Sequence, residues 1–159
     1  MTLTGTINFS SAGSNLVNLT TYNNDRLLKY LPNVTGLVFD GCTNLPSSEM
    51  IFTNMPNLQT LSVYNCTSLD QDIDLSDCPD ITSVDARGTS VNVILPTGTA
   101  ISELKLGSPT SIVIDNPTVM EYDDVTVTDP SDLTEVELIN VNSTTVQGFK
   151  TFGQIMGIL

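Results

Sequence analysis

Three cysteines, Cys42, Cys66 and Cys78, are the residues best suited to metal or redox chemistry, and the chain contains no histidine. A zinc site needs four ligands at close spacing, which the sequence does not offer. Cys42 and Cys66 occupy the same place in two similar segments, "LPNVTGLVFDGCTNL" and "MPNLQTLSVYNCTSL". Because a free cysteine packs as a small buried hydrophobe, we expect structural thiols. A disulfide between Cys42 and Cys66 is the alternative.

Alternating carboxylates form a second candidate site in "DQDIDLSD", residues 70–77. Asp70, Asp72 and Asp74 resemble the start of a calcium-binding loop, which also requires Gly at its sixth position and Glu at its twelfth. Those two positions hold Leu75 and Ile81. We therefore favour a solvated acidic turn, and a looser calcium site within residues 70–77 is the alternative.

A further acidic group lies later in the chain, at Asp123, Asp124, Asp129 and Asp132. Paired carboxylates perform acid–base chemistry where the environment raises the pKa of one of them, and a repeat surface offers no obvious cleft for this. Neither GxGxxG nor GxxxxGK, the glycine-rich phosphate loops, occurs. The sequence thus predicts a protein that is not an enzyme, with no catalytic residue, metal site or cofactor.

Charge restricts the class of partner, because 18 acidic and 5 basic residues give a net charge of −13. Nucleic-acid binding depends on Lys and Arg that neutralise phosphates, so we expect no nucleic-acid partner. Anionic membrane surfaces are disfavoured for the same reason, and no apolar run approaches the ~18 residues of a membrane helix. No signal peptide is expected either. The remaining expectation is a protein partner, with the oligomeric state left open.

One sequence unit recurs along the chain, with the skeleton apolar-x-x-apolar-x-apolar-x-x and then Cys or a small residue. Its copies begin at Val34, Leu58, Ile81, Ile101, Tyr122 and Leu133. The first five starts are about 20 to 24 residues apart, a spacing typical of stacked repeats. Each apolar-x-apolar core predicts a short strand, and stacking the units buries apolar faces that one unit cannot bury alone.

This repeat predicts a single domain over residues 1–159. Residues 1–30 form an N-terminal cap and a degenerate repeat, residues 31–141 carry the repeats, and residues 142–159 form a C-terminal cap or docking tail. Early return segments predict short helical turns with Asp25 or Ser48 as caps. Later returns, "VNVIL" and "SIVID", alternate like strands. The segment from Leu133 to Val141 is a candidate return strand, with Val146 and Phe149 closing the stack.

The skeleton resembles the leucine-rich-repeat consensus L-x-x-L-x-L-x-x-N/C-x-L over residues 16–141, most closely over residues 31–99. It departs from that consensus where Cys42, Cys66 and Thr89 replace the usual Asn, and where later copies carry Pro. The resemblance implies an α/β or mostly-β solenoid, an irregular stack of short parallel strands with helical turns and strands on the return side. Segments such as "SPTSIVIDNPTVMEYDDVTV" are similar in style to leucine-rich-repeat segments of bacteriophage virion structural proteins.

That likeness implies a non-enzymatic structural or decoration module located in the virion, with other virion proteins or a host surface as partners. The alternatives are a bacterial surface adhesin, extracellular or at the cell surface, and a cytoplasmic recognition module that binds a protein or glycan. In each case the partner would contact exposed positions between the strands' apolar residues, where Tyr and Arg are favoured anchors. The candidate interaction face comprises Val38, Asp40, Ser62, Tyr64, Asp85, Arg87 and Lys105.

Stacking predicts two rows on this face. Asp40, Tyr64 and Arg87 form one row, and Val38, Ser62, Asp85 and Lys105 form the next. Three of the chain's five basic residues lie elsewhere, at Arg26, Lys29 and Lys150, so no strong anion site is expected. The alternative is a mixed, solvated face without a partner.

Overall fold

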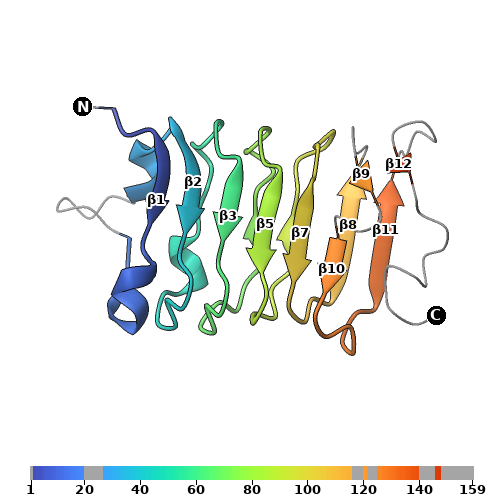
Figure 1. Ribbon diagram of the computed structural model, residues 1–159. Coiled ribbons are helices and arrows are strands. Elements are labelled where there is room, and N and C mark those ends of the chain that lie inside the picture. Colours follow the sequence, from blue (N-terminus) through green and yellow to red (C-terminus); the bar gives the residue numbers. More distant parts are fainter. Residues whose placement is uncertain (1, 20–26, 116–119, 122–124, 140–145, 148–159) are drawn as a thin grey trace.

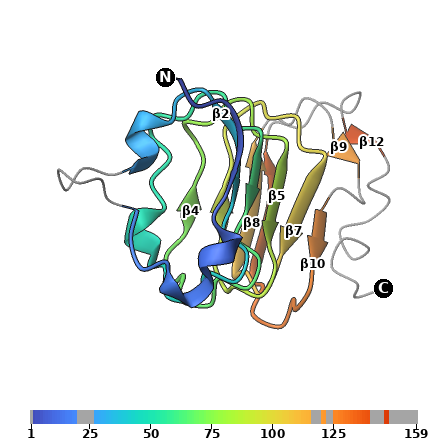
Figure 2. The same cartoon turned by 60° about the vertical axis from the view of Figure 1, so that its left-hand side comes forward.

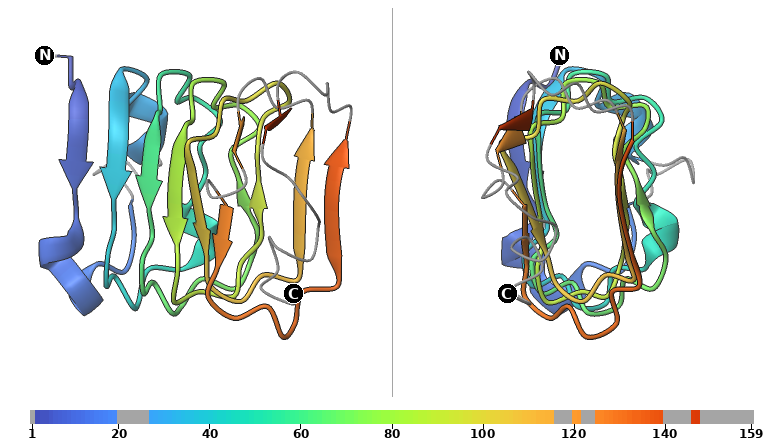
Figure 3. Two further views of the ribbon diagram at one scale, coloured as in Figure 1. Left: turned by 45° about the vertical axis from the view of Figure 1, so that its right-hand side comes forward. Right: turned by 90° about the vertical axis from the view of Figure 1, so that its right-hand side faces the viewer.

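A flattened solenoid of parallel strands is the architecture of the computed structural model, which describes residues 2–19, 27–115, 120–121, 125–139 and 146–147. Successive turns of chain, here called coils, stack along one axis (Figure 1). Viewed along that axis, they superpose on an elongated ring (Figure 3). One long side is the front sheet and the other is the return side. The prediction of a mostly-β solenoid is confirmed.

The front sheet has six strands in the order β1-β2-β3-β5-β7-β10. Every neighbouring pair is parallel. The strands are β1 (Gly5–Asn8), β2 (Val34–Val38), β3 (Thr60–Ser62), β5 (Ser83–Ala86), β7 (Glu103–Leu106) and β10 (Val125–Val127). Five of them are the predicted repeat strands, and β1 adds one more at the N-terminal end.

The strand register aligns the repeat's apolar positions. Leu37 pairs with Leu61, Leu61 with Val84, Val84 with Leu104, and Leu104 with Val125. All five side chains are buried. Because side chains alternate along a strand, the residues between them face outward. Identical positions in successive units therefore become continuous columns of the core, as the repeat predicts.

The return side begins with two 3-10 helical turns, η2 (Leu27–Tyr30) and η3 (Ser47–Glu49), whereas η1 (Ser10–Asn15) follows β1. Strands replace them further along, at β4 (Ile73–Asp74), β6 (Val93–Ile94), β8 (Ser111–Asp115) and β11 (Glu135–Ile139). Figure 2 shows β4 and the helical turns across the core from β5. The remaining strands are β9 (Met120–Glu121) and β12 (Val146–Gln147), which pair with each other. The predicted change from helical to extended returns is confirmed.

The last predicted copy, which starts at Leu133, belongs to the return side, because β11 pairs in parallel with β8. The cap assigned to Ser48 is wrong. Helix η3 starts one residue earlier, with extended Pro46 at the N-cap position and no side-chain cap. The Ser47 hydroxyl instead accepts hydrogen bonds from the backbone N–H groups of Asp70 and Gln71 in the next coil. Asp25, Val141 and Phe149 lie outside the described residues.

Side-chain hydrogen bonds join coils where the backbone ladder is interrupted. The paired strands β4 and β6 form one sheet on the return side, and β8 and β11 form another. Asn92 spans the break: its side-chain oxygen accepts from the backbone N–H groups of Thr110 (2.9 Å) and Ser111 (3.0 Å). Its amide nitrogen donates to Asp72 Oδ1, 3.1 Å away in the preceding coil. Polar side chains such as that of Asn92 thus form hydrogen bonds with backbone groups of neighbouring coils.

Candidate protein-binding face

The predicted interaction face is a continuous surface on the outside of the front sheet. Val38 pairs with Ser62, Ser62 with Asp85, and Asp85 with Lys105, so the predicted row of these four residues is present. Two backbone hydrogen bonds build the other predicted row. Gly41 N–H donates to Tyr64 O (2.8 Å) and Asn65 N–H donates to Arg87 O (2.9 Å). Asp40, Tyr64 and Arg87 therefore follow one another across adjacent coils.

Tyr64 and Arg87 form the most prominent contact of this face. The guanidinium carbon of Arg87 lies 5.2 Å from the centroid of the Tyr64 ring, within the range of a cation–π interaction. Tyr64 remains 40% exposed. Arg87 also forms a fork on Asp85, with Nη2 to Oδ2 at 2.6 Å and Nε to Oδ1 at 2.9 Å. The guanidinium is consequently held in place before any partner arrives.

Asp85 is the charged anchor of this arrangement. Partial burial acts to raise the pKa of its carboxyl, but the hydrogen bonds and charge of Arg87 outweigh burial and hold that pKa below its ordinary value. The same pairing raises the pKa of the Arg87 guanidinium. Asp85 and Arg87 are two residues apart on one side of the strand end, which is why both side chains reach the same place.

A second ion pair lies one coil further along the sheet. Lys105 contacts Glu103, and the Ser83 hydroxyl donates to Glu103 Oε2 over 3.0 Å. These hydrogen bonds lower the pKa of the Glu103 carboxyl. Sequence reasoning omitted Ser83 and Glu103, which belong to a third outward row because Ser83 pairs with Glu103. The sequence did contain a signal for this row, because each of the two residues directly precedes the first apolar residue of its strand.

The remaining members of the face are smaller and mostly half-buried. The Ser62 hydroxyl donates to Asp40 Oδ1 over 2.5 Å. Val38 lies beside Ser62 in the register. The face therefore combines one exposed aromatic ring, ion pairs formed within the sheet, and short polar contacts. This chemistry suits contact with a protein surface.

The cysteines lie inside the solenoid as free, buried thiols, with no disulfide between Cys42 and Cys66. Each thiol faces a backbone carbonyl of the preceding coil. The sulfur-to-oxygen distances are 3.6 Å from Cys42 to Phe9, 3.0 Å from Cys66 to Phe39, and 3.7 Å from Cys78 to Phe52. Burial raises the pKa of the Cys66 thiol to about 11 and that of Cys78 to about 12. Burial also raises the pKa of Cys42.

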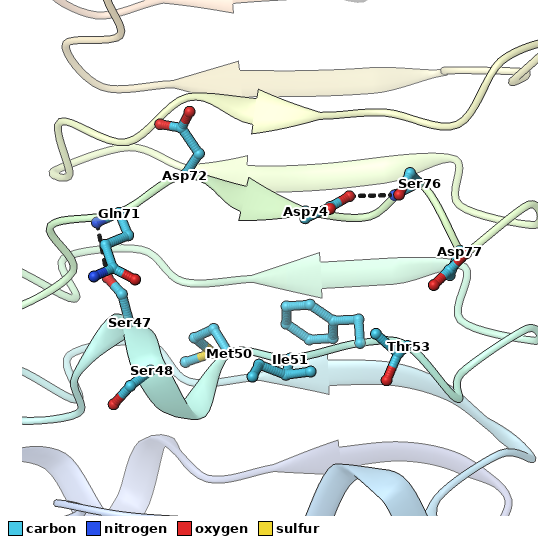
Figure 4. A pocket seen from close by; sticks show the side chains of 11 residues that line it. Ser47, Ser48, Met50, Ile51, Thr53, Gln71, Asp72, Asp74, Ser76 and Asp77 are labelled. Atoms are coloured by element: carbon cyan, nitrogen blue, oxygen red, sulfur yellow. Dashed lines mark hydrogen bonds between the residues drawn. The ribbon is translucent and has the colours of Figure 1, made fainter.

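The acidic segment 70–77 lies on the return side, where Asp72 and Asp74 flank buried Ile73 and are both exposed. They border a hollow of about 230 Å³ beside η3 (Figure 4). Asp74 Oδ1 accepts a hydrogen bond from Ser76 N–H over 2.9 Å. Among the described residues, no three His, Cys, Asp or Glu side chains gather closely enough to hold a metal ion.

The later acidic group is described only in part, since Asp123 and Asp124 lie outside the described residues. Asp129 accepts a hydrogen bond from the backbone N–H of Ser131, which lowers the pKa of its carboxyl. Asp132 is exposed. Of the predicted basic positions, Arg26 and Lys150 also lie outside the described residues, and Lys29 is in η2.

None of the helices in the described segments has the length and apolar character needed to cross a membrane. Comparisons of the chain with protein-family models, with curated proteins and with solved structures found no match.

Proposed function

We propose that the chain is a non-enzymatic structural or interaction module whose front face contacts a protein partner. The arrangement of Tyr64 with Arg87 carries this proposal. Tyrosine and arginine dominate the energetics of many protein interfaces. Here Asp85 already orders the arginine, so less side-chain entropy is lost when a partner binds. The parallel stack also provides a rigid, extended surface of the kind that repeat proteins use for recognition.

The finer proposal is a leucine-rich-repeat-like protein of a bacteriophage virion, bound to other virion proteins or to a host surface. The Cys-type repeats around Cys42 and Cys66 and the Thr-, Asn- and Asp-rich segments support it. A bacterial surface adhesin and a cytoplasmic recognition module for a protein or glycan are the alternatives. Mass spectrometry of purified particles from the native source would detect the chain in virions if the finer proposal is correct. Its absence from them, with presence on the cell surface, would favour the adhesin.

Site-specific photo-crosslinking tests the front face directly. A photoreactive phenylalanine analogue at position 64, expressed in the native source, should crosslink to one protein. The same analogue at exposed Ser131, away from the face, should not capture that protein. Adding Arg87→Ala to the chain labelled at position 64 should weaken the crosslink. Equal capture from both positions, or none from position 64, would overturn the proposal.

A further inference from the structure

The return side carries a row of exposed aliphatic side chains that the front-face proposal does not use. Ile51, Ile94 and Val113 are 37%, 45% and 36% exposed. Ile94 pairs with Asp74, and Val113 pairs with Glu137, so each of these two aliphatic residues has a carboxylate beside it in a neighbouring coil. Large apolar side chains that gather on one surface beside charges are typical of an interaction site.

Two adjacent hollows lie along this row of side chains. The first, about 230 Å³, lies between the η3 segment and the β4 segment and includes Ile51 in its lining (Figure 4). It occurs where the returns change from a helical turn to a strand. A helical turn is wider than an extended segment, so the change leaves a step in the surface.

The second hollow, about 130 Å³, lies at the break between the β4–β6 sheet and the β8–β11 sheet, and Ile94 and Val113 line it. Asp72 borders both hollows, which places them next to each other. The two hollows therefore follow one another across the coils, where a single extended segment can reach both.

The charge of this surface is one-sided. Four carboxylates line the two hollows, and no Lys or Arg from the described part of the chain does; the carboxylates belong to Asp72, Asp74, Asp77 and Asp115. The basic residues of the described chain lie elsewhere: Arg87 and Lys105 on the front sheet and Lys29 in η2. On the front sheet, Asp85 and Glu103 each have a cation beside them. Among the described residues, no such cation lies beside Asp72, Asp74 or Asp77, so a partner would supply the positive charge there.

We propose that the return face, comprising Ile51, Asp72, Asp74, Ile94 and Val113, is a second docking surface, which binds an extended basic segment of a protein partner. Aliphatic side chains of that segment enter the hollows, and its Lys or Arg residues pair with the carboxylates. The complementarity is specific to this partner chemistry: anionic ligands are repelled, and an uncharged segment leaves the carboxylates beside apolar groups without compensation. This surface is separate from the front face and does not depend on it.

The test uses the full chain, labelled with nitrogen-15, and three short synthetic peptides. The first alternates Lys and Leu, the second alternates Lys and Gly, and the third alternates Glu and Leu. In NMR titrations, the Lys–Leu peptide should shift the amide signals around residues 51, 72–74, 94 and 113. Raising the salt concentration from about 50 mM to about 300 mM should weaken binding of this peptide severalfold. The Lys–Gly peptide should bind more weakly, and the Glu–Leu peptide should not bind.

Matched variants separate the proposed site from general attraction to an acidic protein. Binding of the Lys–Leu peptide should weaken by about threefold or more in each of three variants, Asp72→Asn, Asp74→Asn and Ile94→Ser. Asp80→Asn removes an equal charge from an exposed turn outside both hollows and should change affinity by less than about twofold. Arg87→Ala on the front face should have no effect. Each variant's melting curve checks that it is folded.

Three results would overturn the proposal. One is amide shifts spread evenly over the acidic surface, with Asp80→Asn as damaging as Asp74→Asn. Another is equal binding of the Lys–Gly and Lys–Leu peptides, which would remove any role for Ile94 and Val113. The third is no binding of the Lys–Leu peptide at low salt.

Discussion

Asn65 and Gly88 occupy the same position in adjacent coils, and both adopt a left-handed backbone, with φ of 56° and 75°. Gly41, with φ of 72°, holds this position one coil earlier. The turn that ends each of these front strands therefore requires a conformation that is costly for most residues. A Cβ at Gly88 would lie 2.1 Å from Asn65 Oδ1, whereas one at Gly41 would meet nothing within 4 Å. Both glycines thus need a left-handed backbone, but only Gly41 has room for a Cβ atom.

Gly41→Ala should lower the free energy of unfolding by about 1 kcal/mol through backbone strain alone. Gly88→Ala should cost more, because its methyl group also displaces the Asn65 side chain. In an Asn65→Gly background the cost of Gly88→Ala should fall toward that of Gly41→Ala, with a coupling of about 0.5 kcal/mol or more. Urea denaturation of the single and double variants measures each value. Equal costs for the two alanines, with no coupling, would contradict the geometry.

Leu61→Asp should abolish cooperative unfolding, because Leu61 is buried in the column that joins the front strands. An unpaired buried carboxylate costs several kcal/mol, about the whole stability of a domain this size. Thr60→Asp is the matched control: Thr60 is the preceding residue and its side chain is exposed. Far-UV circular dichroism during heating should show a sharp transition for the control only. If the Leu61→Asp variant unfolded as cooperatively as wild type, the stacked-column arrangement of the core would be refuted.

The native chain should react very slowly with a thiol reagent at pH 8. The thiolate is the reactive form, and burial raises the pKa of Cys66 to about 11 and that of Cys78 to about 12. All three cysteines should react at once in denaturing urea. Thr67→Cys, which places a thiol at an exposed turn, should add one fast reaction in the native state. Rapid labelling of any native cysteine would show that the coils do not enclose it.

Acid should remove the stabilisation that Asp85 gains from Arg87. The folded-state pKa of Asp85 lies below its ordinary value of 3.8, so this stabilisation is complete above that value and is lost as pH falls through the folded pKa. The difference in unfolding free energy between wild type and Asp85→Asn should therefore shrink below pH ~4. Arg87→Gln should show the same convergence. Urea midpoints measured at a series of pH values test this, and a constant difference at every pH would exclude the ion pair as its source.

The repeat made much of the fold predictable from sequence. Parallel stacking converts each position of the unit into a column, so the alignment of Leu37, Leu61 and Val84 in the chain became their pairing in the sheet. The outward rows followed by the same argument, since Ser62 and Asp85 alternate with buried neighbours. The cap assigned to Ser48 failed because the Ser47 hydroxyl is used between coils, a contact that depends on the neighbouring turn of chain.

By itself, the sequence determined which residues face inward, which face outward and which are neighbours across coils, because these follow from strand alternation and a constant repeat. The tertiary structure decided how the outward side chains are arranged. The contact of Arg87 with Tyr64 and Asp85 depends on side-chain conformations that a repeat alignment does not specify. The hollows around Asp72 depend on the different widths of adjacent returns and on a break between two small sheets. Such features arise between coils, where each segment's shape is set by the coil on which it packs.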